Sequence, residues 1–301
     1  MSQPTVPPDF SRARRALWLA ALKPPMYSVA VMPIVVGSLL ARQETGVFNG
    51  YVFGLLLLAA VLLLVWENLS NDVYDADTGI DKNKHHSLVN LTQNQALIFW
   101  VGNGCLVLGI AGVVAIAALQ ADATVLWLIL GCCALGYLYQ GPPFRLGYQG
   151  LGEPLCLASF TLGVAAAYYS QAQEFSLACW TLGLVVGMTV TLVLYCSHFH
   201  QVEDDLAAGK RSPIVRLGTA AGATLLPWLC GSIFLLLGGG LLAGLLPLGV
   251  SLALASAPLA VKLCRHVSRY HGQPDRIQNS KFVAIRFQFC CGALLCLGLV
   301  P

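Results

Sequence analysis

The sequence predicts an all-α, polytopic membrane protein. Of its 301 residues, 57% are hydrophobic and 10% are charged, and its mean hydropathy is +0.71. A soluble domain carries about 25% charged residues, so this composition excludes a soluble fold. The apolar runs are close to the ~20 residues that a bilayer helix needs, and they lack the alternation of strands. We therefore expect helices, which satisfy their own backbone hydrogen bonds in lipid.

The apolar runs divide the chain into nine expected transmembrane helices. They follow a short cytoplasmic tail at residues 1–16, and residues 1–301 are expected to form a single membrane domain. An acidic cluster followed by Lys and Ser ends both the second and the sixth span, which favours two four-helix halves plus one further helix. The expected spans are roughly 17–41, 50–68, 95–119, 123–140, 151–170, 177–197, 219–241, 243–263 and 282–300.

The basic residues predict the orientation of these helices. All Lys and Arg except Arg42 and Arg286 lie in the tail, at the start of the first span or in the loops after even-numbered spans. Cytoplasmic loops of membrane proteins carry an excess of Lys and Arg, so we expect a cytoplasmic N-terminus and a C-terminus on the opposite side. Both acidic clusters then lie at the cytoplasmic face.

The two acidic clusters are the most informative polar features of the chain. They cover residues 68–81 and 198–205 and hold half of the 14 acidic residues. Carboxylate and amide oxygens are ligands that Mg²⁺ prefers, and carboxylates at a membrane boundary repel one another unless a cation neutralises them. We therefore expect a Mg²⁺ site for a phosphorylated substrate. The acids of the clusters are Asp72, Asp75, Asp77, Asp81, Glu203, Asp204 and Asp205.

The spacing within each cluster predicts which side chains converge. If the second span stays helical to its end, two asparagines and two aspartates at i, i+3, i+4 and i+7 share one face. At the end of the sixth span, His198, a glutamine and an aspartate at i, i+3 and i+7 share another. The expected metal ligands are Asn68, Asn71, Asp72, Asp75, Gln201 and Asp205. We expect Asp72 and Asp75 to be boundary rather than packing residues, and Asp72, Asp75, Asp205 and Arg145 to be catalytic.

Basic side chains of the cytoplasmic loops complete the expected anion site. Mg²⁺ takes one or two protein carboxylates and fills its other positions with water and phosphate oxygens. Lys and Arg neutralise the outer oxygens of such a diphosphate. The expected diphosphate-binding residues are Lys82, Lys84, Arg145, Lys210 and Arg211.

The motifs resemble those of the UbiA-type intramembrane prenyltransferases. Asn71-Asp72-x-x-Asp75, with Gly79 and Asp81 beyond, is similar to the first aspartate-rich motif of that family. The second cluster, which runs into Gly209-Lys210 and Val215-Arg216-Leu217-Gly218, is similar to the second motif. The resemblance extends over nearly the whole chain. It is closest to the branch that prenylates 1,4-dihydroxy-2-naphthoate, in its cyanobacterial and plastid form, on the stretches Asp72–Lys84, His85–Thr92, Tyr148–Pro154 and His198–Asp205.

This resemblance implies a chemistry and a set of substrate contacts. The implied reaction is the Mg²⁺-dependent transfer of a prenyl group, here phytyl, from its diphosphate to the naphthoate with loss of CO₂, in phylloquinone or menaquinone synthesis. The implied partners are the prenyl diphosphate, the aromatic acid and membrane lipid, with no nucleic acid, in a cyanobacterial inner or thylakoid membrane. Aromatic side chains such as Tyr139 and Tyr148 either would shield the allyl cation or are plain core residues or interfacial anchors. The expected substrate-binding residues are Lys23, Asp81, Tyr139, Tyr148, His198, Glu203 and Asp204.

One position departs from the pattern of the wider family. The second motif there offers two aspartates four residues apart, and this chain has Gln201 at the first position and Asp205 at the second. An amide oxygen ligates Mg²⁺ but brings no charge. Either Glu203 or Asp204 compensates for the missing charge, or the second metal binds more weakly.

Two other functions compete with naphthoate prenylation. Homogentisate phytyltransferase and chlorophyll synthase belong to the same superfamily, but they place the third aspartate four residues after the second and then a Pro-rich stretch. Here position 79 is Gly, Asp81 follows two residues later, and Val89–Thr92 replaces that stretch. A cation or substrate transporter also uses intramembrane acids, but near the middle of its spans. The acids of this chain cluster at span ends beside Lys and Arg.

The orientation gives a first testable prediction. Reporter tags fused to the two ends of the chain should report opposite compartments, with the N-terminal tag in the cytoplasm, because nearly all basic residues fall on one side. Accessibility of each tag to a membrane-impermeant reagent measures this. Finding both tags in the cytoplasm would rule out nine spans.

Overall fold

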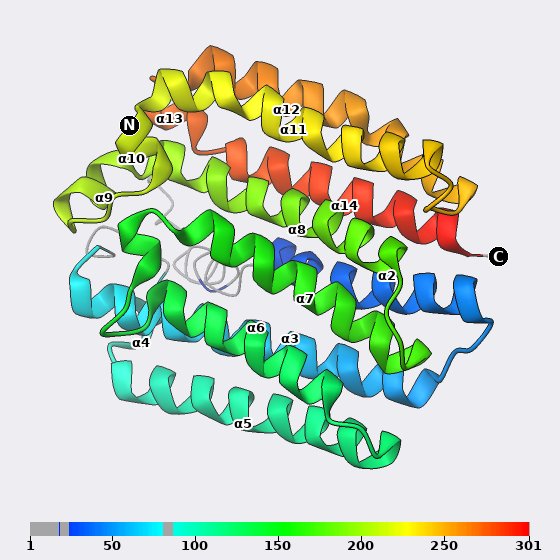
Figure 1. Cartoon of the computed structure of the whole chain (residues 1–301). Coiled ribbons are helices and arrows are strands. Elements are labelled where there is room, and N and C mark those ends of the chain that lie inside the picture. The colour runs from blue at the N-terminus through cyan, green and yellow to red at the C-terminus, as the bar shows by residue number, and fades with distance from the viewer. Residues whose placement is uncertain (1–17, 19–23, 81–86, 301) are drawn as a thin grey trace, which may run out of the picture.

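The computed structural model describes residues 18, 24–80 and 87–300, and in these residues it contains helices and no strand. Long helices run side by side as one bundle, and short helices gather near one end of it (Figure 1). The expected all-α class is therefore confirmed. The long elements are α2 (Tyr27–Thr45), α3 (Gly50–Thr78), α5 (Gln95–Gln120), α6 (Thr124–Gln140), α7 (Gly152–Ala172), α8 (Leu177–Ser197), α11 (Thr219–Leu242), η4 (Leu248–Ser256) running into α12 (Ala257–Tyr270), and α14 (Ser280–Leu299).

Seven helical segments of the described chain are long and apolar enough to span a membrane. They comprise α2 with η1 (Pro24–Met26), α3, α5, α8, α11, η4 with α12, and the segment that ends in α14. Among the other long helices, α6 is apolar but has 17 residues, and α7 has 21 residues that include Glu153 and Gln171. The expected number of nine spans therefore stays a prediction.

The two acidic clusters differ in how the helix before each one ends. The expectation that the second span stays helical through its cluster is confirmed, because α3 continues to Thr78 and Gly79 closes it with a left-handed φ of 73°. The expectation of one helical face from His198 to Asp205 is wrong. Helix α8 ends at Ser197, η3 (His198–His200) follows, and Gln201 with φ −109° precedes α9 (Val202–Ala207). The chain therefore turns within the second cluster.

The two expected four-helix halves pack closely against each other. Helix α7 packs on α2 and α6 of the first half as well as on α8 of the second. Helix α14, expected as an addition to the halves, packs on α2, α8, η4 and α12. Helix α5 lies at the edge of the bundle, where it contacts α3 and α6 (Figure 1). The bundle is thus one continuous packing unit, in which α7 and α14 join the halves.

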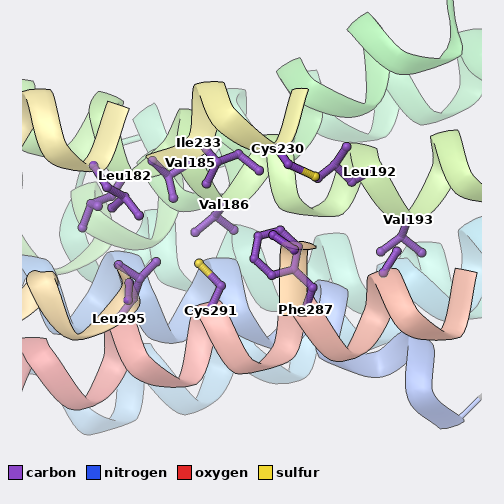
Figure 2. Close-up of a cluster of buried hydrophobic side chains, with 14 of the residues drawn as sticks. Leu182, Val185, Val186, Leu192, Val193, Cys230, Ile233, Phe287, Cys291 and Leu295 are labelled. Carbon is purple, nitrogen blue, oxygen red and sulfur yellow. The ribbon is translucent and has the colours of Figure 1, made fainter. Parts of the chain in front are cut away.

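Buried apolar side chains hold these helices together. The largest cluster joins α8, α11 and α14 through residues such as Val186, Ile233 and Phe287 (Figure 2). A second cluster lies between α2, α3, α5, α6 and α7. Because lipid tails are as apolar as leucine, such helices associate through close packing and not through exclusion of water.

A small third cluster positions part of the polar end. Leu69 and Val73 of α3 pack with Leu88 of α4 (Leu88–Thr92) and Ile98 of α5. The remaining short elements are η2 (Leu146–Gln149), α10 (Pro213–Leu217) and α13 (Pro274–Ile277). The ends of α3 and α8, with α4, α9 and α10, lie at the same end of the bundle (Figure 1). Both acidic clusters are therefore brought to one end of the molecule.

Close contact between α2 and α7 gives a stability prediction. A β-carbon on Gly37 would lie 2.4 Å from the carbonyl oxygen of Val164, so Gly37→Ala should force the two helices apart. Overpacking of this kind costs about 1–3 kcal/mol, which should lower the thermal midpoint in detergent. The matched control is Gly104→Ala in α5, where a β-carbon meets nothing within 4 Å and the substitution should not destabilise. Equal midpoints for the two variants would contradict the packing.

Candidate active site

The first acidic cluster lies on the last turns of α3. Asp72 is 1% exposed, and its Oδ2 accepts a hydrogen bond of 2.9 Å from the backbone N–H of Leu88. Asp72 therefore holds the first turn of α4 against α3, and the expectation that it is a boundary residue without a packing role is wrong. Asp75 is half-buried, and its Oδ1 accepts a hydrogen bond of 3.0 Å from the hydroxyl of Tyr148. Asn68 donates to the carbonyl of Leu64, while Asn71 is half-buried.

The second cluster is a buried chain of contacts between acidic and basic side chains. His198 lies between two carboxylates, with Nε2 3.4 Å from Glu153 Oε1 and Nδ1 3.4 Å from Asp205 Oδ2. Lys210 Nζ lies 3.3 Å from Asp205 Oδ1. Burial raises the pKa of Asp205, but the contact with His198 and the charge of Lys210 outweigh it and leave this pKa below its usual value. Asp205 is therefore an ionised carboxylate with no exposed surface.

Tyr148 of η2 connects the two clusters. Its hydroxyl lies 2.8 Å from Thr78 Oγ1 and donates to Asp75, while Lys210 Nζ lies 5.7 Å from the centroid of its ring. Burial and the nearby Asp75 raise the pKa of Tyr148, so the phenol stays protonated and continues to donate. The contacts thus run without a break from the first cluster, through Tyr148, to Lys210 and Asp205.

The loop before η2 carries Arg145, another of the basic residues that we expect to bind the diphosphate. Arg145 has a left-handed backbone with φ 42°, and its buried Nε has no hydrogen-bond partner in the described chain. A buried donor without a partner fits a site for an anion. The ring of Tyr139 packs against η2 and the start of α7. It lies so close to Gly147 and Gly152 that a β-carbon on either would be 2.7 Å from Tyr139 Cε2.

The described residues do not form a protein-only metal cage. No group of three or more His, Cys, Asp and Glu side chains among them could hold a metal ion. Mg²⁺ is commonly bound by one or two carboxylates together with substrate phosphates, so the acidic ends of α3 and of the second cluster fit a metal that arrives with a diphosphate. Asp75 and Asp205 are the carboxylates that flank Tyr148 and Lys210 in this arrangement.

Several expected site residues lie apart from this network or outside the described chain. Glu203, Asp204 and Arg211 are exposed, whereas Asp205 on the same short helix as the two acids is buried. Gln201 is half-buried at the break between η3 and α9. The residues outside the described chain are Lys23, Asp81, Lys82 and Lys84.

Sequence reasoning missed two members of the network. Glu153 was not expected in the site, yet its carboxylate contacts His198 from the first turn of α7. The sequence does show Glu153 as an isolated acid at the start of an expected span, at the same membrane face as the two clusters. Thr78 was also missed. It lies three residues after Asp75, which would have placed it on the same helix face, and its hydroxyl donates to the carbonyl of Asp75.

Fold and site together define a membrane protein whose apolar helical bundle carries acidic and basic side chains at one end. The model of the UbiA prenyltransferase family matches residues 30–289, and the chain belongs to that family. It is therefore a prenyltransferase, as the resemblance of its motifs implies.

Curated relatives refine this assignment. The chain is 51% identical to the 2-carboxy-1,4-naphthoquinone phytyltransferase of Synechocystis sp. over 292 residues. This alignment covers 97% of this chain and 95% of that protein. It is 41% identical to the chloroplastic enzyme of the same name from Arabidopsis thaliana, over 95% of this chain and 77% of that protein. It is 32% identical to the 1,4-dihydroxy-2-naphthoate octaprenyltransferase of Escherichia coli, over 85% and 86% of the two chains.

A solved structure shares the fold. The UbiA homologue from Archaeoglobus fulgidus bound to GPP and Mg²⁺ superposes with a TM-score of 0.63, over 93% of this chain and 99% of that one, at 16% identity. At that identity the comparison establishes the helical architecture of the family for this chain, and no more.

The link through Tyr148 gives a prediction for prenyl transfer. Tyr148→Phe removes the hydrogen bond to Asp75 and should raise the KM for the prenyl diphosphate by roughly tenfold or more, because a hydrogen bond to a charged group contributes about 1.5–3 kcal/mol. Steady-state kinetics with varied diphosphate measures the change. Tyr137→Phe is the control, since the Tyr137 hydroxyl donates to the Pro142 carbonyl and not to Asp75. A KM unchanged by Tyr148→Phe would show that the contact with Asp75 has no role in binding.

Proposed function

We propose that this chain transfers a phytyl group from phytyl diphosphate to 1,4-dihydroxy-2-naphthoate with loss of CO₂, using Mg²⁺. The observation that carries this proposal is the continuous polar network in which Tyr148 connects Asp75 to Lys210 and Asp205. Such a network offers oxygen ligands and cations side by side, as a metal-bound diphosphate requires. The two phytyltransferases that share 51% and 41% of their aligned residues with this chain support the choice of prenyl group.

The basic residues bind the diphosphate in this proposal. Arg145 offers a buried Nε without a partner, and Lys210 lies between the ring of Tyr148 and the carboxylate of Asp205. Arg211, exposed beside Lys210, reaches the outer oxygens, and Lys82 and Lys84 take the same role. When it is bound, Mg²⁺ withdraws negative charge from the departing diphosphate. Asp72, Asp75 and Asp205, with the amide oxygens of Asn68, Asn71 and Gln201, are the proposed ligands.

The reaction follows from charge stabilisation at this site. The allylic C–O bond breaks and its electron pair leaves with the diphosphate, whose growing charge the Arg and Lys side chains stabilise. The ring carbon that carries the carboxylate then forms a bond to the allyl cation. The bond to the carboxylate breaks next, CO₂ leaves, and its electron pair restores the aromatic ring, so that the charges balance without a net proton transfer.

The acceptor in this proposal is the dihydroxy form of the ring. Capture of a cation requires an electron-rich ring, which two hydroxyl groups provide and a quinone does not. Relatives of this chain are named for both forms, the 2-carboxy-1,4-naphthoquinone and the 1,4-dihydroxy-2-naphthoate. The bundle itself explains the membrane location, because a phytyl tail is apolar and partitions into the hydrocarbon between helices.

A defined assay tests the function. Purified protein with Mg²⁺, 1,4-dihydroxy-2-naphthoate and phytyl diphosphate should release CO₂ and form the prenylated ring, and octaprenyl diphosphate and the quinone acceptor should be poorer substrates. Asp72→Asn is the informative variant, since an amide oxygen still accepts from the N–H of Leu88 while the charge is lost. It should lower turnover by about two orders of magnitude or more, as loss of an electrostatic contact to the leaving group does. Full turnover by Asp72→Asn, or in excess EDTA, would contradict the mechanism.

Gln201 gives a separate test of the second metal ligand set. Gln201→Leu removes an oxygen ligand and should raise the Mg²⁺ concentration for half-maximal activity, whereas Gln201→Asp adds a charge and should be tolerated. Asp275→Asn, which alters an exposed acid of α13 outside both clusters, is the control. Superimposable Mg²⁺ titrations for wild type and Gln201→Leu would exclude the metal role.

A further inference from the structure

Arg216 connects two loops that are far apart in the sequence. This residue lies on the exposed side of α10, and its Nε donates a hydrogen bond of 3.1 Å to the carbonyl of Arg211. Its Nη2 donates to the carbonyl of Gln149 in η2. One guanidinium group therefore bridges the backbone of the loop at 209–212 and the backbone of η2.

These two loops carry the residues that connect the acidic clusters. The loop at 209–212 contains Lys210, which contacts Asp205, and η2 contains Tyr148, which contacts Asp75. The loops also touch directly, because the N–H of Arg211 donates a hydrogen bond of 2.7 Å to the carbonyl of Tyr148. A change in the spacing of the loops would therefore change the distance between the two halves of the site.

Gly150 permits the close approach of the loops. Its φ of 80° is left-handed, and a β-carbon there would lie 2.7 Å from the carbonyl oxygen of Arg211 and 2.9 Å from Arg216 Nε. A side chain at this position would occupy the space where Arg216 reaches across. The contact thus depends on a glycine in one loop and an arginine beyond the other.

Within the described part of the chain, Arg216 contacts backbone carbonyls and pairs with no acid of the site. Among the residues that the structure describes, no carboxylate lies within ion-pair distance of its guanidinium, and both of its hydrogen bonds go to backbone carbonyls. The planar guanidinium spans two acceptors at once with a fixed geometry, which the single ammonium of lysine does not reproduce. Arg216 therefore acts by holding the two loops together and not by pairing with an acid.

We propose that Arg216 is a positioning residue that holds η2 to the loop at 209–212 and so keeps Tyr148 and Lys210 at the spacing that a diphosphate requires. This inference rests on the proposed function of the same site. It assigns a role in substrate binding to an exposed arginine outside both acidic clusters, acting through Tyr148 and Lys210 without touching the substrate.

Direct binding and hydrogen exchange test this role. In Arg216→Gln, the affinity for inorganic pyrophosphate with Mg²⁺, measured by calorimetry, should fall by about tenfold, as loss of one of the two charged hydrogen bonds of Arg216 predicts. Hydrogen exchange at the Arg211 amide should become faster, because the loop opens locally. The KM for phytyl diphosphate should rise while the KM for the naphthoate stays unchanged, and Arg216→Lys should fall between wild type and Arg216→Gln.

Gly150→Ala should disrupt the same contact between Arg216 and η2 by placing a β-carbon close to Arg216 Nε. Since both substitutions disrupt one interaction, the effects of Arg216→Gln and Gly150→Ala on pyrophosphate affinity should not add in the double variant. Arg265→Gln, which removes the charge of an exposed arginine of α12, is the matched control and should leave the affinity unchanged.

The outcomes separate this inference from the proposed function. Wild-type pyrophosphate affinity and Arg211 amide exchange in Arg216→Gln would overturn the positioning role, and the proposed function would stand if Asp72→Asn still loses turnover. An equal loss of affinity in Arg265→Gln would show a general effect of charge and would also overturn it. Wild-type turnover in Asp72→Asn would instead count against the proposed function.

Discussion

The burial of one ionised carboxylate constrains the polar end of this membrane bundle. Asp205 is 0% exposed, and a buried charge that loses its partner destabilises a protein by about 3–5 kcal/mol. Lys210 supplies a positive charge at 3.3 Å, His198 lies at 3.4 Å from the same carboxylate, and Glu153 contacts the other side of the imidazole. The ends of α7 and α8 and the loop at 209–212 are therefore fixed relative to one another by this carboxylate.

The second constraint is that the two acidic clusters belong to different helices and meet only through loops. Tyr148 reaches Asp75 with its hydroxyl and faces Lys210 with its ring. The position of Tyr148 in turn depends on the packing of Tyr139 against η2 and on the hydrogen bond that the backbone N–H of Arg211 donates to the Tyr148 carbonyl. The catalytic proposal and the role of Arg216 are thus two aspects of one arrangement, in which loop geometry sets the spacing of charges.

Much of this arrangement could be predicted from local patterns. The helical periodicity of Asn68, Asn71, Asp72 and Asp75 indicated a shared face, and α3 does continue to Thr78. The same reasoning failed from His198 to Asp205, because spacing assumes a continuous helix and Gln201 interrupts it. His198 and Asp205 meet nonetheless, with Nδ1 3.4 Å from Oδ2, because the turn at Gln201 and not the helical repeat brings the two side chains together.

The sequence by itself determined the membrane-spanning helical class, the family motifs and the gathering of acidic and basic residues, because composition, periodicity and local spacing are properties of short segments. Only the tertiary structure decided that Asp72 holds α4, that Glu153 joins the second cluster and that Arg216 bridges two loops. These contacts join residues from 16 to 67 positions apart, and no local pattern encodes which of many possible partners a polar group will meet once the helices have packed.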